Sequence, residues 1–172
     1  VTIKNTLQDT AMPKFDVVIP PGLQGVYDTW HFAPATVVKG MVYCSGIIGT
    51  SPDGEPLKIR NNSSEATFDG AQATLQDEDA SLADVLAIRD PEAQFEAAFE
   101  GVQAVLSAAG AGMADVVNLT THHVDIGKHM ALFMQVKDRY LPEPWPAWTA
   151  VGVYELIIPG GLVEISVIAS VD

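Results

Sequence analysis

One glutamate interrupts an apolar run close to the end of the chain. Residues 162–168 (LVEISVI) have the composition of a β-strand, and Glu164 is the only charged residue among them. Because side chains alternate between the two faces of a sheet, Glu164 is expected to share a face with Leu162, Ser166 and Ile168. A carboxylate in such surroundings suits a general acid or base. The alternatives are a glutamate on a solvated edge, or one that pairs with another subunit.

The histidines are the next candidates for chemistry. His122 and His123 are neighbours on an expected strand, so they point to opposite faces and only one can serve a given site. We take His123 as the candidate ligand contact, with a structural histidine as the alternative. His31 is a weaker candidate, and His129 is expected to face solvent. No histidine or carboxylate spacing fits a metal site, and we predict neither a metal nor another cofactor.

Nucleophilic catalysis and phosphate binding have little support. Ser45 has no evident base in the sequence, and no nucleophile elbow is present. Gly160-Gly161 is expected to form a hairpin turn rather than a phosphate loop. Trp145 and Trp148 flank Pro146 in an extended, proline-rich segment. Trp145 is expected to pack against a neighbouring subunit or to contact a ligand, and these two alternatives stay open.

The elements that must position these residues follow from periodicity and turn chemistry. An amphipathic helix is expected from the Asp90 N-cap to Gly110, with Pro91 at its first position. A second helix is expected over 128–141, with Met130, Phe133, Met134 and Tyr140 on its inner side. A short helix is one option for residues 81–88. The expected strands are 15–19, 30–38, 41–44, 115–125, 148–157 and 162–171, with hairpin turns at 39–40 and 159–161.

Several short motifs occur in a fixed order along the chain: Ser45-Gly46, Ala108-Ala109-Gly110, Asp115-Val116-Val117, Pro146-Ala147-x-Thr149 and Val163-Glu164-Ile165. In this order and spacing the chain resembles the RidA/YjgF family, also called the endoribonuclease L-PSP family, over about 30–56 and 90–170. The resemblance implies an α+β, chorismate-mutase-like mixed β-sheet with two helices on one face. It also implies a homotrimer whose three inter-subunit clefts bind small carboxylates and hydrolyse enamines and imines.

The resemblance assigns roles to individual positions. Glu164 matches the family's water-positioning glutamate, and Ser45 and Gly46 match its Ser-Gly pair. Apolar residues stand at four further family positions: Trp148 for the carboxylate-binding arginine, Phe32 for a tyrosine, Phe133 for an asparagine and Ala150 for a cysteine. A pocket with these residues suits a flat, apolar ligand stacked on Trp148, Phe32 or Trp30.

Length and composition limit the other possibilities. The 172 residues are 48% hydrophobic, which predicts a single domain over 1–172, with an N-terminal arm (about 1–14) and an acidic insertion (about 57–89). The insertion is expected to be an exposed segment, or else a lid or interface element over a pocket. A net charge of −13 disfavours nucleic acid as a partner. No apolar run is long enough to span a membrane. Without a recognisable signal peptide, a cytoplasmic location is expected.

The resemblance, together with the apolar residues at its altered positions, favours a RidA-like homotrimer whose remodelled inter-subunit cleft binds a small, largely apolar metabolite. If the protein is an enzyme, we expect a hydrolase of the deaminase type acting on a C–N bond, with Glu164 as acid and base. The alternative is a catalytically silent ligand-binding or accessory protein. A carboxylate-directed imine deaminase and an endoribonuclease are less favoured.

Overall fold

The computed structural model describes residues 14–56 and 81–171. The expected N-terminal arm and most of the acidic insertion lie outside these residues. The described strands are β1 (Asp16–Val18), β2 (Ala35–Val38), β3 (Met41–Cys44), β4 (Val116–Val124), β5 (Ala147–Val153) and β6 (Val163–Ser170). The α-helices are α1 (Gln24–Trp30), α3 (Pro91–Ala108) and α4 (Ile126–Tyr140), and short 3-10 helices cover Leu82–Asp84 and Met113–Asp115.

The six strands form one mixed sheet in the order β1-β2-β3-β6-β4-β5. Lys39 and Gly40 both have positive φ and close the β2–β3 hairpin, as the two-residue turn requires. The crossover through α4 makes β4 and β5 parallel neighbours, because parallel strands need such a connection. β6 lies between β3 and β4 and is antiparallel to both. The fold is therefore the expected α+β sheet.

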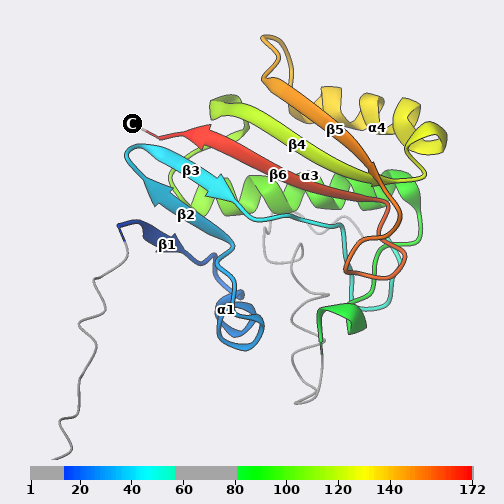
Figure 1. Cartoon of the computed structure of the whole chain (residues 1–172), viewed down its shortest axis with the longest axis horizontal. Helices are drawn as coiled ribbons and strands as arrows, with labels where there is room; N and C mark the ends of the chain where they lie inside the picture. The colour runs from blue at the N-terminus through cyan, green and yellow to red at the C-terminus, as the bar shows by residue number, and fades with distance from the viewer. Residues whose placement is uncertain (1–13, 57–80, 172) are drawn as a thin grey trace, which may run out of the picture.

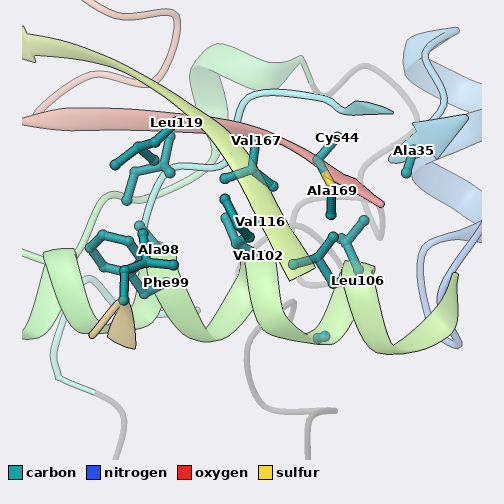
Figure 2. Close-up of a cluster of buried hydrophobic side chains, with 14 of the residues drawn as sticks. Ala35, Cys44, Ala98, Phe99, Val102, Leu106, Val116, Leu119, Val167 and Ala169 are labelled. Carbon is teal, nitrogen blue, oxygen red and sulfur yellow. The ribbon is translucent and has the colours of Figure 1, made fainter. Parts of the chain in front are cut away.

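The main core lies between this sheet and the long helix α3 (Figure 1). Figure 2 shows side chains of α3, among them Phe99, Val102 and Leu106, packed against Leu119 of β4 and Val167 of β6. The three helical residues follow the i, i+3, i+7 spacing of one helix face, and all are fully buried. Each such side chain contributes about 1.5–3 kcal/mol through burial.

Both expected long helices are confirmed. The Asp90 side chain accepts a hydrogen bond from the Ala93 amide and caps α3, and Pro91 occupies the first turn. The second helix, α4, packs against α3 through Phe133, whose ring lies 5.6 Å from that of Phe95. Both helices cover the same face of the sheet. None of the described helices covers the opposite face, which we call the open face.

Two expectations about the strands are wrong. Residues 30–34 are not part of a strand, because the helix α1 ends at Trp30 and His31 adopts a left-handed conformation. The last two strands do not pair with each other: β5 adds to the free edge of β4, and β6 inserts in the centre of the sheet. Gly160-Gly161 therefore belongs to a long connection, not to a hairpin turn.

Three expectations about helical segments also need correction. His129 is only 8% exposed and packs edge-on against Phe95, so it does not face solvent. Met134, expected inside, is exposed. Of the segment 81–88, only Leu82–Asp84 is helical. Among the described residues, no helix is both long and apolar enough to cross a membrane.

Candidate functional site

Glu164 lies on the open face of the sheet. In the register between β6 and β4 it stands directly opposite His122, and the next pair on the same face is Ser166 with Thr120. Directly opposite residues in a sheet have Cβ atoms about 4.5–5.5 Å apart. Glu164 is half-buried in this position. The strand pairing thus brings a carboxylate and an imidazole side by side on the open face, which no helix within 14–56 and 81–171 covers.

Gly46 provides the space that the Glu164 side chain occupies. A Cβ atom built on Gly46 would lie 1.8 Å from Glu164 Oε1, so no larger residue fits without moving the carboxylate. The backbone of the next residue holds this arrangement, because Ile47 and Ile165 exchange two hydrogen bonds of 2.8 and 2.9 Å. The structure therefore brings the predicted residues Glu164 and Gly46 into contact.

Ser45 fixes the chain around this contact. Its hydroxyl donates a 2.6 Å hydrogen bond to the Ala33 carbonyl, and its amide donates to the Pro34 carbonyl at 3.0 Å. The hydroxyl proton is therefore engaged, which agrees with a positioning role and not with a nucleophile. Burial raises the pKa of the adjacent Cys44 thiol to about 12, so this thiol is protonated and unreactive at neutral pH.

Trp148 belongs to a different part of the molecule. It pairs in register with Leu119, and therefore lies on the helix-covered face, opposite to Glu164. Its indole Nε1 donates a 2.9 Å hydrogen bond to Thr121 Oγ1, which lies 2.8 Å from His123 Nε2. If the threonine hydroxyl donates onward to that nitrogen, the imidazole proton resides on Nδ1. The three side chains then form one continuous hydrogen-bonded chain.

His123 is a core residue in this structure. It has no exposed surface, and its ring packs edge-on against Phe133 at 4.7 Å. Burial, with a smaller contribution from His122, lowers the pKa of His123 to about 4, so the imidazole is neutral at pH 7. Phe133 is also fully buried and lies 6.0 Å from the Trp148 ring. Neither residue presents an atom to solvent in this chain.

A lysine lies beside Trp148. Lys137 Nζ is 5.4 Å from the Trp148 ring and 4.7 Å from the exposed Trp145 ring, distances at which a cation interacts with an aromatic face. The same ammonium group is 2.6 Å from Asp138 Oδ1. Ala150 is exposed on β5, on the same face as Trp148. A cation therefore remains near the position at which the family resemblance places an arginine.

Trp30 and Phe32 form a third group. Both line an apolar pocket of about 80 Å³ together with Val26, Ile47 and Val85. Among the described residues, Trp148 makes its aromatic, hydrogen-bond and cation–π contacts with Phe133, Thr121 and Lys137, and not with Trp30 or Phe32. The predicted ligand contacts thus fall into three groups, and only the Glu164 group lies on the open sheet face.

Three residues near these groups were not predicted: His122, Thr121 and Lys137. The alternation that placed His122 and His123 on opposite faces already contained the signal for His122, because Glu164 is on the neighbouring strand. Thr121 gave no such signal, since its contact with Trp148 depends on the register of β4 with β5. Lys137 gave none either, because its contacts depend on the packing of α4 against Trp145 and Trp148. Within 14–56 and 81–171, no group of histidine, cysteine and acidic side chains could hold a metal ion.

Known proteins resemble this chain in both sequence and fold. The profile of the family described as Endoribonuclease L-PSP matches residues 86–171, half of the chain. The chain is 26% identical to a structural-genomics protein named YJGH, with a TM-score of 0.66 and coverage of 92% of this chain and 98% of the other. It is 28% identical to RidA from the Antarctic bacterium Psychrobacter, with a TM-score of 0.56 and coverage of 81% and 88%.

A Rid-family protein of unknown function from Yersinia pestis has the same fold, at 23% identity, a TM-score of 0.61 and coverage of 91% and 99%. A search of curated proteins finds no significant match.

Proposed function

Because this chain belongs to the endoribonuclease L-PSP family, also called the RidA/YjgF family, we propose that it forms a homotrimer whose inter-subunit clefts bind a small, largely apolar metabolite. We further propose that the cleft hydrolyses a C–N bond in this metabolite. Glu164 is the acid and base, and Ser45, Gly46 and Ala150 line the cleft.

The observation that carries this proposal is the position of Glu164 over Gly46 on the open sheet face. The same face exposes apolar side chains on either side of it. Tyr43 and Val151 are 43% and 40% exposed, and Val151 is the register neighbour of His122. A sheet face with exposed apolar residues is stabilised when another copy covers it. A carboxylate on that face would then lie within or beside a subunit interface.

The division of the predicted residues supports two copies at each site. Glu164 and Trp148 project from opposite faces of one sheet, so a small ligand cannot contact both within a single chain. A closed ring of identical subunits brings one face of a chain against a different surface of its neighbour. In the proposed trimer, one subunit supplies Glu164, Gly46 and Ser45, and the next supplies Trp148 and Ala150.

The indole at position 148 favours an uncharged ligand. Carboxylate recognition is strongest with the paired N–H groups of a guanidinium, which Trp148 lacks. Its single N–H is already bonded to Thr121. Lys137 lies near, but its ammonium group is paired with Asp138 and its side chain is only 8% exposed. The exposed part of Trp148 therefore offers an apolar ring surface for stacking.

The chemistry follows from the position of the carboxylate. A water held by Glu164 attacks the carbon of a C=N bond, and the carboxylate accepts the water proton. Glu164 returns this proton to the nitrogen, which gives a neutral carbinolamine. The carboxylate then accepts the hydroxyl proton and transfers it to the amino nitrogen as the C–N bond breaks. The products are a carbonyl compound and ammonia or an amine, so atoms and charge balance without a cofactor.

The decisive experiment compares two imines generated in situ by an amine oxidase. We expect that the wild-type protein accelerates hydrolysis of an uncharged imine of a small ketone. We also expect that it leaves 2-iminopropionate at the background rate, in contrast to an arginine-bearing family member. Glu164→Gln keeps the size of the side chain and should remove the acceleration. Light scattering on the same samples should give the mass of a trimer for both proteins.

Three other outcomes would each contradict one part of this proposal. Acceleration of 2-iminopropionate to the level of the arginine-bearing control would contradict the apolar cleft. A monomeric mass would contradict the shared site. Saturable binding of the ketone that is weakened in Glu164→Gln, by a trimer that accelerates neither imine, would contradict turnover and support the alternative, a catalytically silent ligand-binding protein.

A further inference from the structure

A pocket within the single chain lies apart from Glu164 and Trp148. It is formed by α1, the stretch 47–50 that follows β3, the 3-10 helix Leu82–Asp84 with the residue after it, and Ile158. It lies between the main core and a smaller second core that consists of Val85, Ala87 and Ile158. Its walls include Leu23, Val26, Ile47, Ile48, Val85 and Ile158.

The walls of this pocket are almost entirely apolar. Among the described lining residues, Thr50 and Trp30 carry a polar side-chain atom, and the other side chains are hydrocarbon. Water gains little in such a space, because it needs two to four polar partners. An apolar group that enters displaces poorly bound water and buries its own surface. The pocket therefore favours hydrocarbon over a polar or charged group.

Trp30, one of the lining residues, carries an unpaired hydrogen-bond donor. Its Nε1 is buried and has no hydrogen-bond partner, a condition that it shares only with His123 Nδ1 among the buried side-chain atoms of the described residues. The indole N–H can only donate, so an acceptor is required to satisfy it. A buried donor left without a partner is costly, and a ligand that carries an acceptor removes this cost.

The volume limits the group that fits. At about 80 Å³ the pocket is about half the size of the roughly 150 Å³ engineered cavity that takes benzene. A branched aliphatic group of three or four carbons therefore matches it better than an aromatic ring. We propose that this pocket binds the branched aliphatic end of a small neutral carbonyl compound, whose oxygen accepts a hydrogen bond from Trp30 Nε1.

This site does not include the residues assigned to the proposed inter-subunit cleft. Its described lining residues include Phe32, which the family resemblance places at a tyrosine position. They all belong to one chain, and none of them is Glu164, Gly46, Trp148 or Ala150. Binding here should therefore persist in Glu164→Gln and in any oligomeric state. Loss of the imine activity would leave the pocket proposal intact, and failure of the pocket would leave the cleft proposal intact.

Two probes of the same shape test the proposal: 3-methyl-2-butanone, which has the carbonyl, and 2,3-dimethyl-1-butene, which replaces the oxygen with a CH₂ group. In ¹⁵N–¹H spectra the chain gives three indole signals, one for each tryptophan. Trp30→Phe assigns the signal of Trp30. We expect the ketone to move this signal in a saturable way, with the signals of Trp145 and Trp148 as internal controls. The alkene should bind several-fold more weakly.

Variants separate the pocket from non-specific binding. Ile48→Phe adds volume at a half-buried lining residue and should abolish the shift of the Trp30 signal. Leu132→Phe makes a similar change at a half-buried position on α4, outside the pocket, and should leave the shift intact. Trp30→Phe should bind both probes equally. An unmoved Trp30 signal in the wild-type protein, or equal affinity for both probes, would overturn the proposal.

Discussion

Gly46 and Glu164 share one volume on the open face of the sheet: a Cβ atom on Gly46 would lie 2.5 Å from Glu164 Cδ and 2.7 Å from its Cγ. The first prediction is that Gly46→Ala displaces the carboxylate and removes the proposed hydrolysis as completely as Glu164→Gln does. The atoms in the way belong to a flexible side chain, so the free energy of unfolding should fall by less than about 1 kcal/mol. Urea unfolding and the imine assay measure the two effects.

Gly127→Ala is the matched control for this change. Gly127 lies on α4, and no atom lies within 4 Å of a Cβ built there. Alanine is favoured over glycine in a helix by about 1 kcal/mol, so this variant should be slightly more stable and fully active. An active Gly46→Ala protein would show that the position of Glu164 over Gly46 is not needed for catalysis.

The second prediction concerns Gln94, a fully buried residue of α3. Its amide nitrogen donates to the carbonyls of Ile88 and Gly160, and its amide oxygen accepts a 2.6 Å bond from the Leu162 amide. These bonds hold the connection that leads into β6. Gln94→Leu leaves buried backbone groups unpaired and should cost about 2–4 kcal/mol in thermal or urea unfolding. Gln103→Leu, at an exposed position of the same helix, should cost less than about 0.5 kcal/mol.

Local signals predicted the elements of this fold better than their arrangement. Asp90, Pro91 and the apolar face of α3 act within one segment, so its start, face and end could be predicted. The short helix α1 was missed because it buries only Val26 and has no cap, while aromatic residues at its end favoured a strand. The place of β6 depends on pairing between distant strands, and no adjacent residues encode it.

The candidate site was also predicted better where the signals are local than where it depends on strand register. Glu164 and Gly46 were predicted from their positions in motifs, and their contact needs only the pairing of Ile47 with Ile165. Trp148 was expected to face a ligand together with Trp30 and Phe32. The structure separates them, since the face on which Trp148 lies is set by the register of β5 with β4. A shift of one residue would reverse that face, and sequence alone does not fix the register.

The third prediction uses the buried His123. In the unfolded chain this histidine has an ordinary pKa near 6.5, whereas burial lowers it to about 4 in the folded protein. Between these values the unfolded state binds more protons, so stability rises with pH. The contribution of neutral, buried His123 to the free energy of unfolding is fully present above about pH 6.5. It is lost as the pH falls towards 4, by up to about 3 kcal/mol. Urea unfolding from pH 4.5 to 7.5 should show this slope.

Two variants assign the slope to one side chain. His123→Phe keeps an aromatic ring beside Phe133 but cannot titrate, so its stability should be lower at pH 7 and depend less on pH. His122→Gln changes the neighbouring histidine on the open face and should retain most of the slope. An unchanged slope in His123→Phe would assign the acid sensitivity to other groups.

The fourth prediction tests the remodelled cleft by restoring the family residue. Trp148→Arg loses the hydrogen bond to Thr121 and the contact with Phe133, which should lower the free energy of unfolding by about 2–3 kcal/mol. The new guanidinium lies near Lys137, but Asp138 already pairs with that ammonium group and offsets the repulsion. Two charge-assisted hydrogen bonds to a carboxylate should then tighten binding of 2-keto acids by about 10- to 100-fold.

Calorimetry with pyruvate, together with light scattering for the oligomeric state, measures this gain. Trp145→Arg is the matched control, because it adds the same charge at an exposed position three residues away on the same segment and should not improve binding. A trimeric Trp148→Arg protein without keto-acid binding would show that position 148 does not face the ligand. Equal gains in both variants would mean that net charge, not the geometry of the cleft, controls the affinity.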